Sequence, residues 1–321
     1  MNPRYLPVTV TGILFLVLLV AGSVQFPGFA SPRVMLNLLT DNAFLAITAL
    51  GMTFVILSGG IDLSVGSVLA FSSVLCAALV ENFGWHPFQA IPLVLVLGAA
   101  FGAIMGTLIH VYKLQPFIVT LAGMFFARGL ATIISEQSVP IEHTFFDAVN
   151  DFGFSLPGGA WLSSAAILLF VMFSFGLWLA HFTRLGGYIY ALGGSAHSAA
   201  LLGVPVGLTT ISIYTLSSAL AALSGVVYSF YTASGYALTG IGLELDAIAA
   251  VVIGGTLISG GYGYVLGTLL GVMTMGLIQT WISFHGSLNS WWTKIFIGGL
   301  VLIFIIFQRW ISFGLGKRKT S

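Results

Sequence analysis

Apolar runs about as long as a membrane span alternate with short polar connections along the whole chain. A helix needs about 20 mainly apolar residues to cross a bilayer. The candidate spans are Pro7–Phe26, Leu36–Leu57, Leu63–Val80, Ile91–Val111, Pro116–Ile134, Trp161–Ala180, Thr209–Tyr231, Leu245–Ile258, Tyr264–Phe284 and Trp292–Trp310. The segment Leu245–Ile258 is short, so we expect it to be broken or only partly inserted. The pattern predicts an all-α, polytopic membrane protein of about ten transmembrane helices, forming one domain over residues 1–321.

The composition excludes the soluble classes of protein. Apolar residues make up 58% of the chain and charged residues only 6%, against about 25% charged residues in soluble domains. Cys76 is the only cysteine and lies in an apolar run, so an intrachain disulfide is excluded and neither a metal nor a cofactor is expected. Met1–Val24 has the form of a signal peptide, but no clean cleavage site stands near Ala30 and more spans follow. A retained first helix is therefore favoured.

The charged residues predict the orientation. With a cytoplasmic N-terminus, the acidic loop Ser135–Ala160 falls outside and most basic residues fall inside, as the positive-inside rule favours. Arg33 and Lys294 fall on the other side and count against this threading. The basic residues placed inside are Arg4, Lys113, Arg184, Arg309, Lys317, Arg318 and Lys319. We expect a multi-pass protein with both termini in the cytoplasm.

One polar, glycine-punctuated insertion, Thr183–Val206, stands out between the apolar runs. Within it, Ser195 can cap a two-turn helix that Gly203 and Pro205 would end. A helix this short is not stable alone in water, so it must dock on something. On the threading above the insertion is cytoplasmic. It therefore predicts a contact with a soluble partner.

Two glycine-rich breaks carry acidic residues at membrane depth. Gly59-Gly60 permits a sharp backbone turn, and Asp62 and Ser64 follow it. Broken helices in a membrane often line pathways, but Asp62 can equally be a helix cap. Glu244 and Asp246 stand where a later helix begins, and compensation of the helix dipole explains them without a function.

Other polar residues inside the predicted spans divide between two interpretations. Arg128 lies about 18 Å along its helix from Pro116, in the outer half of the membrane, where it would mark a pathway, snorkel, or pair with Glu136. The uncharged candidates are Asn37, Asn42, Gln115, Thr120, Tyr231, Gln279 and Thr280. Each of these can be a helix–helix hydrogen bond or a ligand contact. Together they suit a neutral polyhydroxy solute better than protons or ions.

Missing motifs narrow the function further. The chain has no Walker A sequence, so it cannot power transport itself, and it has neither the H-E-x-x-H nor the G-x-S-x-G pattern of a membrane hydrolase. An ion-coupled secondary transporter remains an alternative, although a buried carboxylate cluster for coupling ions is missing. A membrane enzyme is a second alternative, in which Asp62 would meet Glu244 or Asp246 in space.

Three motifs carry a resemblance to a known family. They are Gly59-Gly60-Ile61-Asp62-Leu63-Ser64-Val65-Gly66-Ser67, the loop Thr183–Gly203, and Glu244-Leu245-Asp246-Ala247-Ile248-Ala249-Ala250-Val251-Val252-Ile253-Gly254-Gly255. With them, nearly the whole chain resembles the permease of bacterial ABC sugar importers, which handle ribose, xylose, arabinose and galactofuranose. The runs Phe26–Ser31 and Leu288–Lys294 resemble most a permease of a galactofuranose importer.

The resemblance implies an assembly and a mechanism. A ten-helix permease in the bacterial inner membrane would pair with a second permease, two ATP-binding subunits and a periplasmic sugar-binding protein. The family's ATPase-docking loop matches this chain at Arg184, Gly186, Ala191, Gly193, Ala199 and Gly203. Where the family often carries an asparagine, this chain has Ser195-Ala196-His197, so His197 is a further docking candidate but is better explained as a surface histidine. ATP-driven closure would move the Ser195–Leu202 helix as a lever, and the sugar pathway would form between the two permeases. The pathway candidates are Asp62, Ser64, Thr120, Arg128, Tyr231, Glu244, Asp246 and Gln279.

Overall fold

The structure, a computed structural model, describes residues 6–289 and 291–317, with side chains for residues 7–289 and 291–306. Arg4, Arg318 and Lys319 and the side chains of Arg309 and Lys317, used above for the orientation, lie outside this part. The helices are α1 (Leu6–Gln25), α2 (Pro32–Asp41), α3 (Ala43–Leu57), α4 (Val65–Ala77), the π-helix η2 (Ala78–Asn82), α5 (Pro87–Val111), α6 (Pro116–Ile134), α7 (Thr144–Asp151), α8 (Ser164–Phe182), α9 (Arg184–Gly194), α10 (Ala196–Leu201), α11 (Val206–Thr232), α12 (Leu243–Ile253), α13 (Val265–His285) and α14 (Trp291–Lys317).

Four short strands join the connections between helices. Strand β1 (Val139–Pro140) pairs antiparallel with β4 (Ser234–Gly235), and β2 (Gly153–Leu156) pairs antiparallel with β3 (Ala160–Ser163). Helix α7 and strand β2 lie in the predicted outer loop, Ser135–Ala160. Strand β3 extends beyond this loop to Ser163, so the predicted span Trp161–Ala180 begins three residues later, with α8. The β2–β3 pairing orders the connection between α7 and α8.

The helical, polytopic architecture is confirmed, whereas the count of ten spans is not. Seven described helices are long and apolar enough to cross a membrane, and the pair α2–α3 makes eight if it counts as one bent span. The predicted short segment near residue 250 is the 11-residue helix α12. The described apolar part of α14, Trp291–Ile306, is also shorter than a full span.

The predicted span Leu36–Leu57 is bent by 57° between α2 and α3. The bend falls on Asn42, which ends α2 and begins α3, and its Nδ2 donates to the Leu38 carbonyl at 2.9 Å. Thr40, Asp41 and Asn42 form a polar triplet inside the apolar run. These residues compete with the helix backbone for hydrogen bonds, which explains the break.

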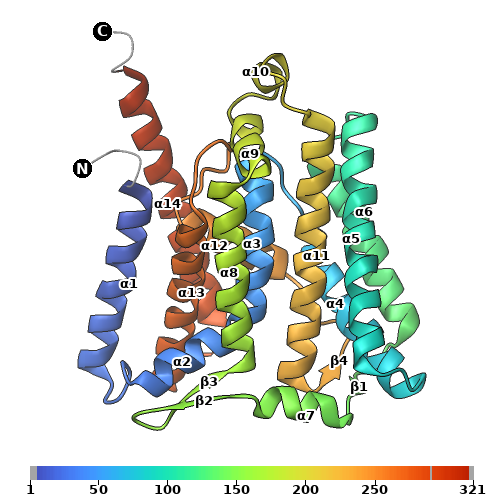
Figure 1. The fold of residues 1–321 in the computed structure, drawn as a ribbon. Helices are drawn as coiled ribbons and strands as arrows, with labels where there is room; N and C mark the ends of the chain where they lie inside the picture. Colours follow the sequence, from blue (N-terminus) through green and yellow to red (C-terminus); the bar gives the residue numbers. More distant parts are fainter. Residues whose placement is uncertain (1–5, 290, 318–321) are drawn as a thin grey trace.

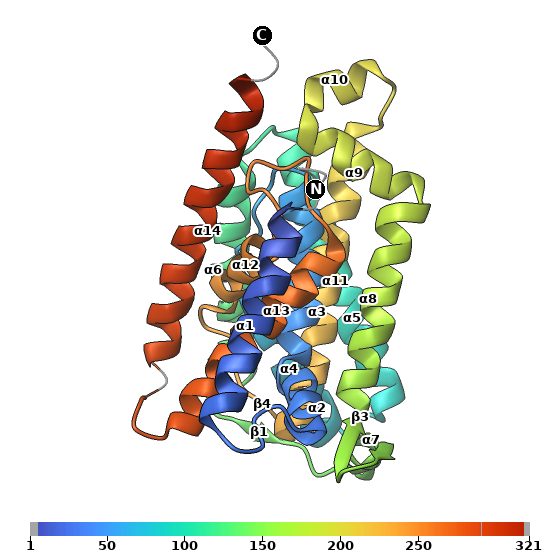
Figure 2. The same cartoon turned by 90° about the vertical axis from the view of Figure 1, so that its left-hand side faces the viewer.

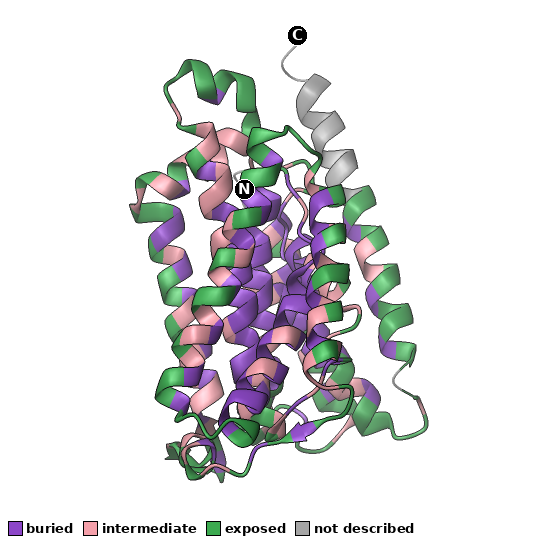
Figure 3. Cartoon of the chain, turned by 90° about the vertical axis from the view of Figure 1, so that its right-hand side faces the viewer, coloured by how far each residue is buried: buried purple, intermediate pink, exposed green. Residues whose placement is uncertain are grey.

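Helix α3 is the centre of the bundle, and every residue in it except Phe44 is buried. It packs against α8, α11, α12 and α13, while the outer helices keep their apolar faces exposed, as Figure 3 shows. On α5, the small residues Gly98 and Gly102 lie against Ala222 and Ser218 of α11. These two glycines thus allow α5 to pack closely on α11.

The bundle has two distinct ends (Figures 1 and 2). Helices α9 and α10 lie at one end together with the start of α1 and the end of α14, and we call this the α10 end. Helix α7 and the β2–β3 hairpin lie at the opposite end, the α7 end. Helix α11 connects the two directly. Its 27 residues span about 40 Å, enough to cross a bilayer.

Candidate functional site

At the α10 end, the insertion Thr183–Val206 folds as two capped helices. The Ser195 Oγ accepts a hydrogen bond from the Ser198 amide at 3.2 Å and caps α10, and Gly203 ends that segment at a φ of +81°. The predicted helix is therefore confirmed. Helix α9 was not predicted, because its four glycines suggested a loop. The Thr183 Oγ1 caps it by accepting from the Gly186 amide at 3.1 Å.

Two of the four glycines of α9 lie against neighbouring backbone, and the other two face open space. A Cβ on Gly186 would overlap the Ala180 carbonyl, and one on Gly193 would overlap the Leu57 carbonyl and approach the Gly261 amide. A Cβ on Gly187 or Gly194 would meet nothing. Two of the glycines thus let the backbone of α9 lie directly on neighbouring backbone, a close approach that only glycine permits.

Helix α9 rests on the ends of two helix breaks. The Tyr190 hydroxyl donates to the Gly263 carbonyl at 2.8 Å, and the Gly261 amide donates to the Leu57 carbonyl at 2.8 Å. Burial raises the pKa of Tyr190 to about 12, so its hydroxyl stays protonated and remains a donor. Helix α9 is therefore attached both to the end of α3 and to the α12–α13 connection.

Helix α10 presents apolar side chains outward. Leu201 is 76% and Leu202 is 83% exposed, whereas Ala199 beneath them is only 2% exposed. Of the residues that the family resemblance assigned to ATPase docking, Arg184, His197 and Gly203 are exposed and Gly186 and Ala199 are buried, so direct docking through these last two stays a prediction. An exposed apolar tip on a capped helix is a natural surface for a protein partner.

The Gly59-Gly60 break is closed by polar contacts among buried side chains. Asp62 is fully buried and accepts hydrogen bonds from the Ser64 amide at 2.9 Å, the Ser64 hydroxyl at 2.6 Å and the Ser217 hydroxyl at 2.8 Å. The buried Thr120 hydroxyl donates to the Ile61 carbonyl at 3.3 Å. These contacts tie the break to α6 and α11. Asp62, Ser64 and Thr120 line neither of the cavities described below, and their place on a pathway stays a prediction.

Arg128 is held by backbone carbonyls. Its guanidinium donates to the carbonyls of Ala237 and Thr239, at 2.5 and 2.6 Å, in the connection that precedes α12. It also attracts Glu244 electrostatically, and the Glu244 carboxylate lies against the backbone of Gly66. Pairing with Glu136 was one of the possibilities that the sequence left open for Arg128. In the structure these carbonyls and the Glu244 carboxylate are its partners instead. Arg128 and Glu244 thus join α6, α12 and the start of α4.

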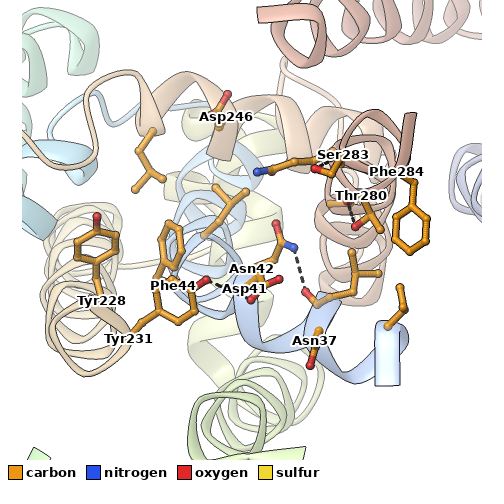
Figure 4. Close-up of a pocket in the computed structure, with 16 residues that line it drawn as sticks. Asn37, Asp41, Asn42, Phe44, Tyr228, Tyr231, Asp246, Thr280, Ser283 and Phe284 are labelled. Atoms are coloured by element: carbon orange, nitrogen blue, oxygen red, sulfur yellow. Dashed lines mark hydrogen bonds between the residues drawn. The ribbon is translucent and has the colours of Figure 1, made fainter. Parts of the chain in front are cut away.

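A cavity of about 580 Å³ opens at the α7 end, between α2, the start of α3, α11, α12 and α13 (Figure 4). Its size falls within the range of about 300–1,000 Å³ of small-molecule sites. The residues that line it are Val34, Asn37, Leu38, Asp41, Asn42, Phe44, Leu45, Tyr228, Tyr231, Leu243, Asp246, Gly276, Gln279, Thr280, Ser283 and Phe284. Three predicted pathway residues, Tyr231, Asp246 and Gln279, are therefore brought together here.

A second cavity of about 340 Å³ adjoins the first and shares Asp246 and Gln279 with it. Lys294 of α14 lines this second cavity and bonds to Asp246, with a 2.6 Å distance from Nζ to Oδ2. This ion pair neutralises one of the carboxylates and joins α12 to α14. Among the described residues, no three His, Cys, Asp or Glu side chains are placed to hold a metal ion.

The sequence did not single out Asp41 or Tyr228, which also line the first cavity. A signal for Asp41 was present, because a carboxylate inside an apolar span is a functional candidate by default. Tyr228 carried no such signal. It stands three residues before Tyr231 on α11, and residues at that spacing share a helix face.

The cavity and α10 lie on opposite sides of the bundle. Tyr231 stands about 38 Å along α11 from its first residue, Val206, which directly follows the α10 segment. Helix α3 links the two regions, because Leu57 at one end contacts Gly193, and Phe44 and Leu45 at the other end line the cavity. A polar cavity on one side and an exposed apolar helix tip on the other are features expected of a membrane permease that a separate partner drives.

The comparisons with known proteins agree with this class. The family model described as branched-chain amino acid transport system / permease component matches residues 34–305, and the chain belongs to this family. No solved structure matches the chain.

Curated relatives cover almost the whole chain. It is 55% identical over 321 residues to the inner membrane ABC transporter permease protein YjfF of Escherichia coli, covering 100% of this chain and 97% of the relative. The fructose import permease protein FruG of Bifidobacterium longum is 38% identical, covering 99% and 95%. The ribose import permease protein RbsC of Escherichia coli is 35% identical, covering 92% and 91%.

The chain is thus a multi-pass inner-membrane permease subunit of an ABC importer, and the ATPase is a separate subunit. The predictions of a transport subunit without its own ATPase and of a permease of this importer class are confirmed. The relatives do not identify galactofuranose as a cargo.

Proposed function

We propose that this subunit carries a monosaccharide, galactofuranose in particular, into a bacterial cell. The names of two relatives, import permeases for fructose and for ribose, support a sugar as cargo. The polar, uncharged side chains Asn37, Gln279 and Thr280 in the cavity suit a neutral polyhydroxy solute. Galactofuranose rests on the sequence runs Phe26–Ser31 and Leu288–Lys294 alone.

The single observation that carries the proposal is the continuity of α3. This buried helix contacts α9 through Leu57 and lines the cavity through Phe44 and Leu45. A push on α9 is transmitted along α3 to the cavity wall, because packed helices move as rigid bodies. In this mechanism the α9–α10 segment is the lever, and the cavity wall is the element that it moves.

The partners follow from this arrangement. The α10 end faces the cytoplasm, where two ATP-binding subunits dock through Leu201, Leu202 and the exposed matched residues Arg184, His197 and Gly203. The other matched residues, Gly186, Ala191, Gly193 and Ala199, are buried or half-buried and hold α9 and α10 in the shape that docks. The α7 end faces outward and receives a loaded sugar-binding protein. A second permease, a paralogue of this chain, completes the pathway. The permease binds its solute weakly, because a tight site would slow release.

Within the predicted pathway, the residues divide into two roles. Tyr231, Asp246 and Gln279 line the outer mouth that the sugar enters. The remaining pathway candidates, which hold the helix breaks and connections in place, are Asp62, Ser64, Thr120, Arg128 and Glu244.

The lever is tested by the double substitution Leu201→Asp with Leu202→Asp in the co-expressed transporter. We expect the permease to insert normally and to lose both the co-purified ATP-binding subunits and sugar uptake. Tyr112→Asp is the control, because Tyr112 is 68% exposed in the turn between α5 and α6. Unimpaired uptake by the double variant would refute the lever. Uptake measured with each sugar and binding protein in turn tests galactofuranose.

An ion-coupled secondary transporter is the alternative function. It predicts that the purified chain, alone in liposomes, accumulates sugar along an ion gradient without ATP. Among the described residues, Asp62 bonds to serines and Asp246 bonds to Lys294, so each of these carboxylates has its own protein partner. That pairing does not favour a coupling-ion site.

A further inference from the structure

The polar groups of the larger cavity are arranged around one carboxylate. Asp41 is exposed at the bend between α2 and α3, and Tyr231 from α11 donates its hydroxyl hydrogen to Asp41 Oδ1 (Figure 4). The oxygen–oxygen distance is 3.2 Å. That is long for a hydroxyl on a carboxylate, where about 2.5–2.7 Å is usual. The bond is therefore weak and easily replaced.

The surroundings of Asp41 combine rings with neutral polar groups. Phe44, Tyr228 and Tyr231 present aromatic rings, with a centroid distance of 5.3 Å between Phe44 and Tyr228. Gln279 and Ser283 project from α13 on the other side of the cavity. Aromatic walls with a few fixed polar groups are the usual design of small-molecule sites.

The two carboxylates that line the cavity, Asp41 and Asp246, differ in whether they are free to bind a solute. Asp246 is neutralised by Lys294, at 2.6 Å, whereas Asp41 has no ion pair among the described residues. An ionised carboxylate is an acceptor only, with room for about four hydrogen bonds on its two oxygens. Tyr231 uses one of these positions, so Asp41 can accept hydroxyl groups from a solute.

We infer that this cavity is a transient monosaccharide site, in which Asp41 accepts hydroxyl hydrogen bonds from the sugar in place of the Tyr231 hydroxyl, and the aromatic rings pack on the sugar ring. The inference rests on the proposed function and adds a residue-level site within the permease. Because the sugar must displace an existing hydrogen bond, its net gain is small. This competition explains how a built site can bind weakly.

The test uses the assembled, ATPase-bound transporter and the single natural cysteine. Cys76 is fully buried, so an introduced cysteine is the reactive thiol. Ser283→Cys places that thiol in the cavity. Ser287→Cys, an exposed position in the bend that follows α13 and outside the cavity lining, is the matched control. We expect galactose, ribose or fructose to slow the reaction of Ser283→Cys with a small thiol reagent, and to leave Ser287→Cys unaffected.

Two further substitutions, each combined with Ser283→Cys, distinguish a sugar site from a structural contact. Asp41→Asn replaces the charged acceptor. It should raise about tenfold the sugar concentration needed to protect the Ser283→Cys thiol from the reagent. Tyr231→Phe keeps the ring, removes the competing hydroxyl and should strengthen protection several-fold. If the Asp41–Tyr231 bond only holds α2 to α11, both substitutions change protection in the same direction, which overturns the inference.

Other outcomes also decide the matter. If ethanolamine protects the thiol and none of the sugars does, the cavity is a cation site. If the sugars protect the control position equally, the effect is non-specific. Either result refutes the inference. ATP-dependent sugar uptake, measured on the same preparation, separates the two proposals. Uptake without protection leaves the permease function standing and removes the sugar site. Protection without ATP-dependent uptake keeps the site and removes the importer mechanism.

Discussion

The two ends of the bundle share helix α3 but are built in opposite ways. At the α10 end, backbone meets backbone, because Gly193 of α9 lies on Leu57 of α3 and on Gly261 without side chains between them. At the α7 end, side chains from α3 and its neighbours stand apart around a cavity of about 580 Å³. Close-packed backbone transmits displacement with little loss, whereas a side-chain cavity can change shape and admit a solute. Under the proposed function, the α10 end would transmit force and the α7 end would contact the solute.

The largest effect is expected where backbone contacts are tightest. Gly193→Ala places a methyl group on the Leu57 carbonyl and should cost about 1–3 kcal/mol of stability, with loss of most sugar uptake. In the neighbouring variant Gly194→Ala, the added methyl group points into open space and helix propensity rises. This variant should therefore keep both its stability and its sugar uptake. Thermal unfolding and uptake of the two variants measure the contrast. Equal behaviour would contradict the role given to the α10 end.

The next effect concerns the buried tie at the Gly59-Gly60 break. Asp62→Ala leaves the donors of Ser64 and Ser217 without their acceptor and should lower the free energy of unfolding by about 1–3 kcal/mol. Asp62→Asn keeps one acceptor oxygen and should lower it by less. Transport per folded molecule should be retained in both variants. Lost transport at unchanged melting temperature would return Asp62 to the pathway.

At the α7 end, we expect a substitution to reduce sugar uptake while leaving stability almost unchanged. Gln279→Ala removes an exposed side chain, so the free energy of unfolding should change by less than about 0.5 kcal/mol. Uptake should nevertheless fall several-fold, because Gln279 lines both cavities. Asn289→Ala, which is exposed outside the cavity lining, is the control. A parallel loss of stability and uptake would erase the distinction between the ends.

The smallest effect is expected for the ion pair of Lys294 with Asp246. The Lys294 side chain is 54% exposed, and exposed pairs contribute about 0–1 kcal/mol. Lys294→Gln should therefore shift the melting temperature only slightly, and exchanging the two charges should restore it. A shift as large as that of Gly193→Ala would show that this end is as tightly coupled as the other.

Much of the architecture was predictable from the sequence, because apolar runs of span length report directly on membrane helices. The α10 helix was predictable from Ser195 and Gly203, which mark a beginning and an end by local hydrogen bonding. The clustering of Tyr231 and Gln279 was not. These residues lie 48 positions apart and meet only through the packing of α11 on its neighbours.

The misses have identifiable physical causes. The glycines of α9 lower helix propensity, and the segment is helical because Thr183 caps it and because its glycines pack on Ala180 and Leu57. The bend at Asn42 depends on a polar triplet that hydropathy averages away. Arg128 was expected near Glu136, but the carbonyls of a connection more than a hundred residues later hold it instead.

Four hydroxyl groups on α4 and α11 are left without a hydrogen bond in the interior of the bundle. They belong to Ser67 and Ser72 on α4 and to Tyr214 and Ser218 on α11, and each is buried and lacks a hydrogen-bond partner among the described residues. A buried hydroxyl group that makes no hydrogen bond costs about 1–3 kcal/mol of free energy. The interior of α4 and α11 is therefore less stable than its close packing alone would make it.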